Sequence, residues 1–131
     1  MPDVNWLAVV LAAASAFVLG GLWYGPLFLK AWSREAGIAV HANKRHPAAV
    51  FGGALVLSLV AAWAMAAVIG RGDHSLLFPV HVGLLTGLCV VATSFGINYL
   101  FAGRSFKLWL IDAGYHVLQF TLYGLVIGLM P

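Results

Sequence analysis

The residues best able to do chemistry in this sequence lie on one side of a single predicted helix. Asp112, His116, Gln119 and Tyr123 are separated by four, three and four residues, a spacing that places side chains on one helical face. Asp112 and His116 can both titrate, so the stripe could relay a proton or a cation. The simpler explanation is structural, because polar side chains between membrane helices also hold them together, at about 0.6 kcal/mol per hydrogen bond.

The partners of this stripe are expected on the preceding hydrophobic stretch. A tight turn near residue 103 would place Asn98 within one turn of Asp112, and Ser94 within one turn of His116, because the two helices then run antiparallel. Unpaired polar groups are costly in lipid, so we expect His116 to face this stretch. The sequence predicts an intramembrane polar seam with these members: Asp112, His116, Gln119, Tyr123, Asn98 and Ser94.

Other kinds of site find little support in the residue pattern. The sequence shows no nucleophile–base motif, no glycine-rich phosphate loop and no paired catalytic carboxylates, so an enzyme is not favoured. The histidine pairs His41/His46 and His74/His81 lack a third ligand at the spacing of a metal site. We therefore predict neither a metal nor a cofactor.

The elements that position the stripe are set by the hydrophobicity of the chain. Its 131 residues are 63% hydrophobic and 8% charged, whereas an ordinary soluble domain is about a quarter charged. The charges leave four long apolar stretches, each long enough for the roughly 20 residues that cross a bilayer. The sequence predicts one all-α integral-membrane domain over 1–131, with transmembrane helices at about 5–25, 47–69, 76–101 and 107–130. Cys89, inside the third, is expected to be a small core residue.

A short interfacial helix is predicted at about 26–37, between the first two spans. Pro26 suits the first turn of a helix, and Gly37 suits its end. Apolar residues on one side and Lys30 and Arg34 on the other are typical of a helix that lies along the headgroups. An interfacial aromatic cluster is expected from Trp23, Tyr24, Trp32 and Trp109.

The basic residues predict the orientation. Six of them, Lys30, Arg34, Lys44, Arg45, Arg104 and Lys107, fall on one side of a four-span protein, against Arg71 on the other. Basic loops stay in the cytoplasm, so both termini are expected outside it, in a bacterial cytoplasmic (inner) membrane. Orientation explains the positive net charge, and the sequence holds no pattern for binding nucleic acid.

Glycines four residues apart predict close helix packing. Such pairs are Gly21 with Gly25, Gly83 with Gly87, and Gly124 with Gly128. Small residues let membrane helices approach closely, within one chain or between copies of a homo-oligomer.

The two ends of the chain carry a resemblance. The stretches "NWLAVVLAAASAFVLGGLWYGPLF" and "FAGRSFKLWLIDAGYHVLQF" resemble a bacterial family of small four-helix membrane proteins known only as domain of unknown function 1761. The residues that fit its pattern are Asn5, Trp6, Gly20, Trp23, Tyr24, Pro26, Phe28, Trp32, Asp112, Gly114, Tyr115 and His116. The resemblance implies four spans and supplies no activity.

Three functions remain open from the sequence. The favoured one is a small membrane scaffold or accessory protein that packs with itself or with a larger membrane complex, because the chain has glycine-faced helices and no soluble domain. The second is a minimal oligomeric transporter or channel with Asp112, His116 and Gln119 along its path. The third is a lipid- or quinone-binding protein whose tryptophans surround an inner-leaflet cleft.

Overall fold

The structure, a computed structural model, describes residues 2–37 and 45–131. The all-α fold is confirmed, with four apolar helices long enough to cross a membrane: Trp6–Leu27, Pro47–Ile69, Leu77–Ala102 and Phe106–Leu129. The helical elements in chain order are α1 (Trp6–Leu22), η1 (Trp23–Leu27), α2 (Leu29–Ala36), α3 (Pro47–Ile69), α4 (Leu77–Leu85), η2 (Thr86–Val91), α5 (Ala92–Ala102) and α6 (Phe106–Leu129). The two η elements are single wide π-helical turns, one ending the first span and one inside the third.

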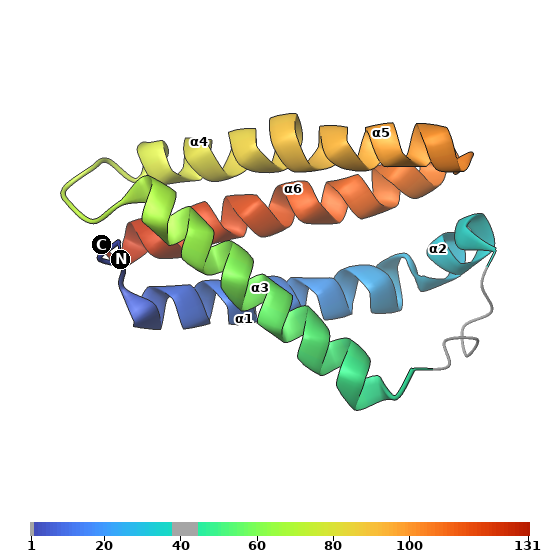
Figure 1. Ribbon diagram of the computed structural model, residues 1–131, viewed down its shortest axis with the longest axis horizontal. Helices are drawn as coiled ribbons and strands as arrows, with labels where there is room; N and C mark the ends of the chain where they lie inside the picture. Colours follow the sequence, from blue (N-terminus) through green and yellow to red (C-terminus); the bar gives the residue numbers. More distant parts are fainter. Residues whose placement is uncertain (1, 38–44) are drawn as a thin grey trace.

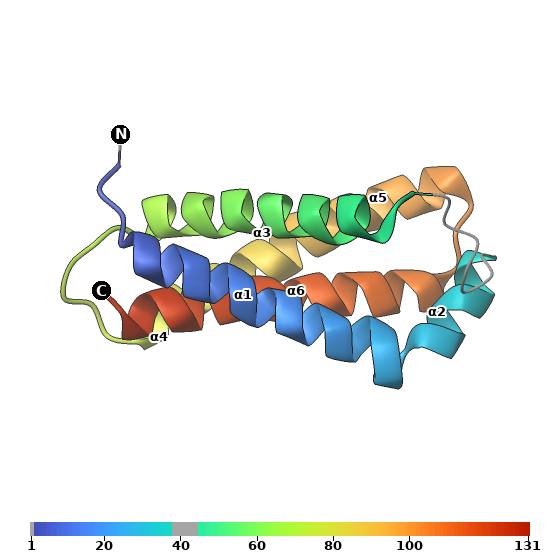
Figure 2. The same ribbon diagram turned by 90° about the horizontal axis from the view of Figure 1, so that it is seen from below.

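Helix α6 is the centre of the bundle and packs against α1, α3, α4 and α5 (Figures 1 and 2). Both chain termini lie at one end of the bundle, which we call the termini end. Helix α2 lies at the opposite end, the α2 end, beside the turn that joins α5 to α6.

Two of the three glycine pairs bring the third span, through α4 and η2, into close contact with α6. A Cβ on Gly87 would lie 2.8 Å from the Val117 Cα, and one on Gly124 would lie 2.8 Å from the Pro79 carbonyl carbon. Gly83 and Gly128 are as closely covered. Around Gly21 and Gly25, by contrast, an added Cβ would meet nothing within 4 Å, so this pair does not pack against another helix in the described part of the chain.

Helix α3 is packed along only half of its length. At the termini end, Ala62 and Ala66 pack against Ala8, Ala12 and neighbouring residues of α1 in the apolar core. Toward the α2 end, residues 51–57 are all exposed, and Figure 1 shows α3 (green) diverging from α1 and α6. The small alanines permit the close crossing at the termini end.

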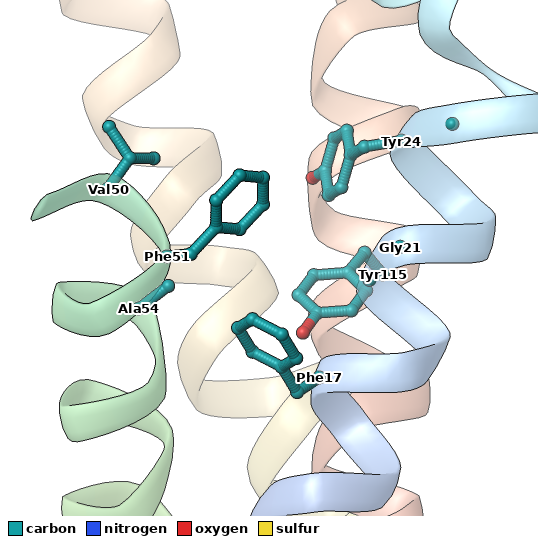
Figure 3. Close-up of a pocket in the computed structure, with 9 residues that line it drawn as sticks. Phe17, Gly21, Tyr24, Val50, Phe51, Ala54 and Tyr115 are labelled. Carbon is teal, nitrogen blue, oxygen red and sulfur yellow. The ribbon is translucent and has the colours of Figure 1, made fainter. Parts of the chain in front are cut away.

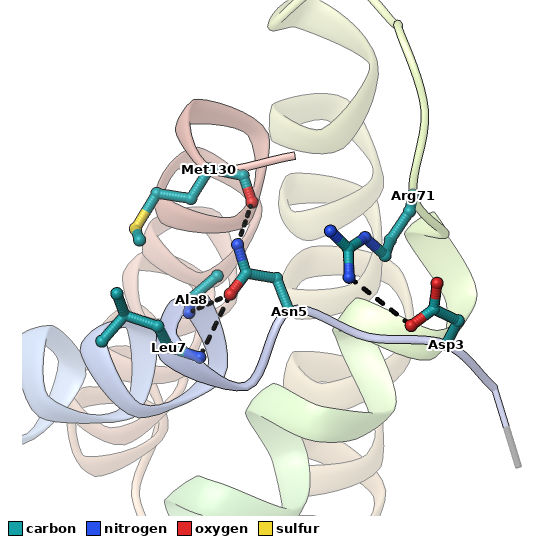
Figure 4. A network of polar contacts seen from close by, with 6 residues as sticks. All are labelled: Asp3, Asn5, Leu7, Ala8, Arg71 and Met130. Atoms are coloured by element: carbon teal, nitrogen blue, oxygen red, sulfur yellow. Dashed lines mark hydrogen bonds and ion pairs between the residues drawn. The ribbon is translucent and has the colours of Figure 1, made fainter.

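Each end of the bundle is joined by polar contacts. At the termini end, Asn5 caps α1 and donates to the Met130 carbonyl at 3.1 Å, while Arg71 pairs with Asp3 at 3.5 Å (Figure 4). At the α2 end, the Arg104 guanidinium donates to the Ala36 carbonyl at 3.2 Å.

The short helix between the first two spans is confirmed at Leu29–Ala36, and it ends at Gly37 in the left-handed conformation, φ 69°. It does not begin at Pro26 as predicted, because Pro26 lies inside the wide turn η1 that continues the first span. Its position along the headgroups stays a prediction. Cys89, expected in the core, is instead exposed on the outside of the third span. Lys44 and His41 lie outside the described residues.

Candidate functional site

Asp112 is the hub of a contact between three spans. The residue is only 7% exposed, and its carboxylate accepts one hydrogen bond from the Tyr24 hydroxyl, at 2.7 Å, and another from the Tyr99 hydroxyl. Tyr24 belongs to the wide turn η1, Tyr99 to α5 and Asp112 to α6. Both carboxylate oxygens therefore have a partner, which meets the need of a buried charge for hydrogen bonds.

A second polar group forms a chain across the middle of the bundle. The His116 Nδ1 contacts the Gln119 Oε1 at 2.5 Å, and the Gln119 Nε2 donates to the Tyr123 hydroxyl at 2.6 Å. The Tyr123 hydroxyl lies 2.6 Å from the Ser58 Oγ, which donates to the Ala13 carbonyl at 3.4 Å. This polar chain links α6 to α3 and α1.

The structure does not bring Ser94 and Asn98 into the predicted seam. Both are exposed, and the Ser94 hydroxyl donates to the Val90 carbonyl of its own span. Phe95 and Tyr99, one residue further along the chain, face α6 instead. The predicted turn fixes how far along α6 these residues lie, but it does not fix which side of α5 faces α6.

His116 faces the third span, as predicted from the cost of exposing a polar ring to lipid. Its contacts differ from the predicted ones. Its ring stacks on Phe95, with centroids 4.7 Å apart and planes 21° apart. Its Nδ1 bonds to Gln119 rather than to Asp112 or Ser94. The stripe of α6 is thus divided into an Asp112 hub and a separate chain that begins at His116.

The diverging half of α3 opens an intramembrane cleft. Its main hollow, of about 430 Å³, is lined from α1, η1, α3 and α6 by Phe17, Gly20, Gly21, Tyr24, Gly25, Val50, Phe51, Ala54 and Tyr115 (Figure 3). A second hollow, of about 320 Å³, is lined by Phe17, Ala54, Leu57, Ser58, Ala61, Val91, Tyr115, His116, Gln119 and Phe120. The hollows share Phe17, Ala54 and Tyr115, so we treat them as one cleft.

The wall of the cleft is apolar except for a few hydroxyl, amide and imidazole groups. None of the described residues that line either hollow is charged. Both wide turns contribute to the lining, η1 through Tyr24 and Gly25 and η2 through Val91. Single π-helical turns in helices are frequent at functional sites, and volumes of this size are ordinary for ligand pockets.

The predicted aromatic cluster is brought together only in part. Tyr24 and Trp32 form an edge-to-face pair at 6.1 Å, and the Trp23 indole donates to the Ile111 carbonyl at 2.8 Å. The Trp109 indole instead donates to the Ala92 carbonyl on α5, at 2.9 Å. These tryptophans therefore fix helix contacts, and none is among the residues that line the two hollows.

Several site residues were missed from the sequence. Tyr99 completes the Asp112 hub, Ser58 ends the polar chain, and Tyr115 lines both hollows and donates to the Ala16 carbonyl at 3.0 Å. Ser58 is the one hydroxyl residue within 47–69, a signal that could have identified it. Within the described ranges, no three His, Cys, Asp or Glu side chains gather as they would around a metal ion.

Comparison with known proteins gives one family. Residues 7–128 match the family described as protein of unknown function (DUF1761). No curated protein matches the chain, and no solved structure does.

Proposed function

We propose that this chain, which belongs to the DUF1761 family of proteins of unknown function, is a small membrane protein that binds one amphipathic lipid in the intramembrane cleft. The observation that carries the proposal is the half-packed helix α3. Its residues 51–57 are exposed beside a hollow of about 430 Å³. Such a hollow is filled by lipid or by a specific ligand, and polar groups on its wall favour a ligand with a polar head.

The cleft ends inside the bundle, which supports binding over transport by a single chain. The polar chain stops at Ser58 and Tyr123. Beyond them, toward the termini end, α1, α3 and α6 are joined by an apolar cluster that includes Ala8, Val9 and Met65. An ion would have to cross this cluster without polar partners, at a cost of several kcal/mol.

Native mass spectrometry of the gently solubilised protein tests the proposal. We expect a lipid-sized adduct that survives activation in the gas phase. Ala54→Phe should remove the adduct, since Ala54 lines both hollows and is labelled at the cleft in Figure 3. Ala64→Phe is the matched control, because Ala64 is a residue of the same helix and lines neither hollow. An adduct that persists in Ala54→Phe, or is lost in both variants, would contradict binding in the cleft.

The scaffold function favoured by the sequence keeps one supporting observation. Gly52 and Gly53 lie on the exposed half of α3, and a Cβ on either would meet nothing within 4 Å. A helix of a second copy or of a membrane-protein partner could pack there. Gly53→Leu should then reduce self-association measured by sedimentation in detergent and leave the lipid adduct in place. Unchanged sedimentation would remove the support for a homo-oligomer through this face.

The orientation is proposed with the same function. Lys30 and Arg34 belong to α2, and Arg104 and Lys107 lie at the turn from α5 to α6 beside it, whereas Arg71 pairs with Asp3 at the termini end. Arg45 directly precedes α3. This asymmetry supports a cytoplasmic α2 end and both termini outside the cytoplasm, in a bacterial inner membrane.

A further inference from the structure

The hydrogen-bond directions in the polar chain can be assigned from the Gln119 amide, and they bear on the ligand of the proposed function. The amide nitrogen of Gln119 can only donate, and it donates to the Tyr123 hydroxyl oxygen at 2.6 Å. The Tyr123 hydroxyl in turn is hydrogen-bonded to the Ser58 hydroxyl. This orientation of the amide points the Gln119 Oε1, which can only accept, at His116.

The direction of the chain determines the tautomer of His116. Because the Gln119 Oε1 accepts, the Nδ1 of His116 must carry the hydrogen. A neutral imidazole has one hydrogen, so its Nε2 is an acceptor. Among the described residues, Nε2 has no hydrogen-bond partner, and His116 lines the inner hollow of the cleft. The chain thus leaves one unused acceptor near the middle of the bundle.

The surroundings of this acceptor exclude a charged ligand head. The described residues lining the cleft include no cation that would neutralise a phosphate and no carboxylate that would pair with an amine. His116 lies near the centre of the span Phe106–Leu129, where an unpaired charge is costly. A neutral head group that donates one hydrogen bond would pair with the ring nitrogen and would carry no charge near the centre of the span.

We infer that the cleft selects a neutral, single-tailed lipid whose head carries a free hydroxyl, and that this hydroxyl donates to the Nε2 of His116. The inference rests on the proposed function. The shared lining of Phe17, Ala54 and Tyr115 makes the two hollows one slot, which suits one tail. The tail leaves past the half of α3 at which residues 51–57 are all exposed.

A matched series of ligands tests the hydroxyl. The probes are farnesol, farnesyl methyl ether and farnesyl phosphate, each titrated against the full chain in detergent while the thermal unfolding midpoint is followed, since a ligand that binds the folded state raises it. We expect farnesol to bind about tenfold more tightly than the ether, the equivalent of one buried hydrogen bond. We expect the phosphate to bind more weakly than farnesol.

Variants assign the selectivity to His116. His116→Phe keeps a ring to stack on Phe95 and removes the acceptor, so farnesol and its ether should bind it equally. Ser94→Ala is the control, because Ser94 is exposed and bonds its own helix, and should keep the preference. If His116→Phe does not fold, the wild-type series still decides.

The outcomes separate the two proposals. Equal binding of alcohol and ether to the wild type, or stronger binding of the phosphate, would overturn the hydroxyl inference and leave lipid binding standing. Retained selectivity in His116→Phe would overturn the role of Nε2. If no member of the series binds although a lipid adduct is present by mass spectrometry, the single-tailed hydroxyl class is wrong. If neither is seen, the proposed function itself fails.

Discussion

Replacing two helical glycines by alanine should change stability in opposite directions. Gly124 and Gly53 both lie inside long apolar helices. An added Cβ at Gly124 would lie 2.8 Å from the Pro79 carbonyl carbon and closer still to its oxygen, whereas at Gly53 it would meet nothing within 4 Å. The same substitution therefore tests the contact between α4 and α6 against open space.

The magnitudes follow from two competing effects. Alanine in a helix is more favourable than glycine by about 1 kcal/mol. Ordinary van der Waals contact for a Cβ begins near 3.4 Å, so at Gly124 the two backbones must separate, and forced overpacking costs about 1–3 kcal/mol. We expect Gly124→Ala to lower the free energy of unfolding by up to about 2 kcal/mol, since the cost of overpacking exceeds the gain from alanine. Gly53→Ala should raise it by up to about 1 kcal/mol.

The assay is reversible unfolding in mixed micelles, with increasing sodium dodecyl sulfate and circular dichroism as the readout. The free energy of unfolding should depend on detergent concentration with the same slope in both variants, because a changed slope would indicate a changed unfolded state. A Gly124→Ala protein as stable as Gly53→Ala would refute the backbone contact between α4 and α6. Gly124 would then have no role in close helix packing.

Three further outcomes are expected. Tyr24→Phe and Tyr99→Phe should each lower the free energy of unfolding by about 1–2 kcal/mol, because each removes one donor to the Asp112 carboxylate; additive effects in the double variant would show that the two bonds are independent. A reporter active only in the cytoplasm, fused after Pro131, should be silent, and activity there would reverse the proposed orientation. Spin labels at Phe28 and Lys30 of the short segment around α2 should differ in lipid and water accessibility, and equal accessibility would place this helix away from the membrane surface.

The helices were predictable from the sequence because their causes are local. Charge-free stretches of sufficient length gave the four spans, and Gly37 gave the end of the short helix. The predicted start at Pro26 was wrong, because Pro26 lies inside the wide turn η1 and the helix begins at Leu29. Two of the glycine pairs were also identified correctly as sites of close helix packing, because the positions of small residues on a helix can be read directly from the sequence. The bounds of all four spans lie within two residues of the prediction.

The cleft was not predictable, because it depends on how whole helices cross. Nothing local distinguishes the packed half of α3 from its exposed half, and both are apolar. The side of α5 that faces α6 could not be predicted from the sequence either. Its height beside α6 follows from the turn, but the choice of Phe95 and Tyr99 over Ser94 and Asn98 depends on tertiary packing. The wide turn η2, which precedes α5 within the same span, has no evident signal in the sequence.

The residues of the polar stripe of α6 differ in whether their hydrogen-bonding atoms all have partners within the protein. Asp112 has a donor on each carboxylate oxygen, Gln119 uses both ends of its amide, and the Tyr123 hydroxyl is hydrogen-bonded to both Gln119 and Ser58. A group whose hydrogen bonds are satisfied within the protein holds helices together and has little left to offer a ligand. In the described part of the chain His116 alone among the four keeps an unused ring nitrogen, and it borders the cleft. Under the proposed function, the first three residues therefore hold helices together, and His116 is the member of the stripe that contacts the ligand.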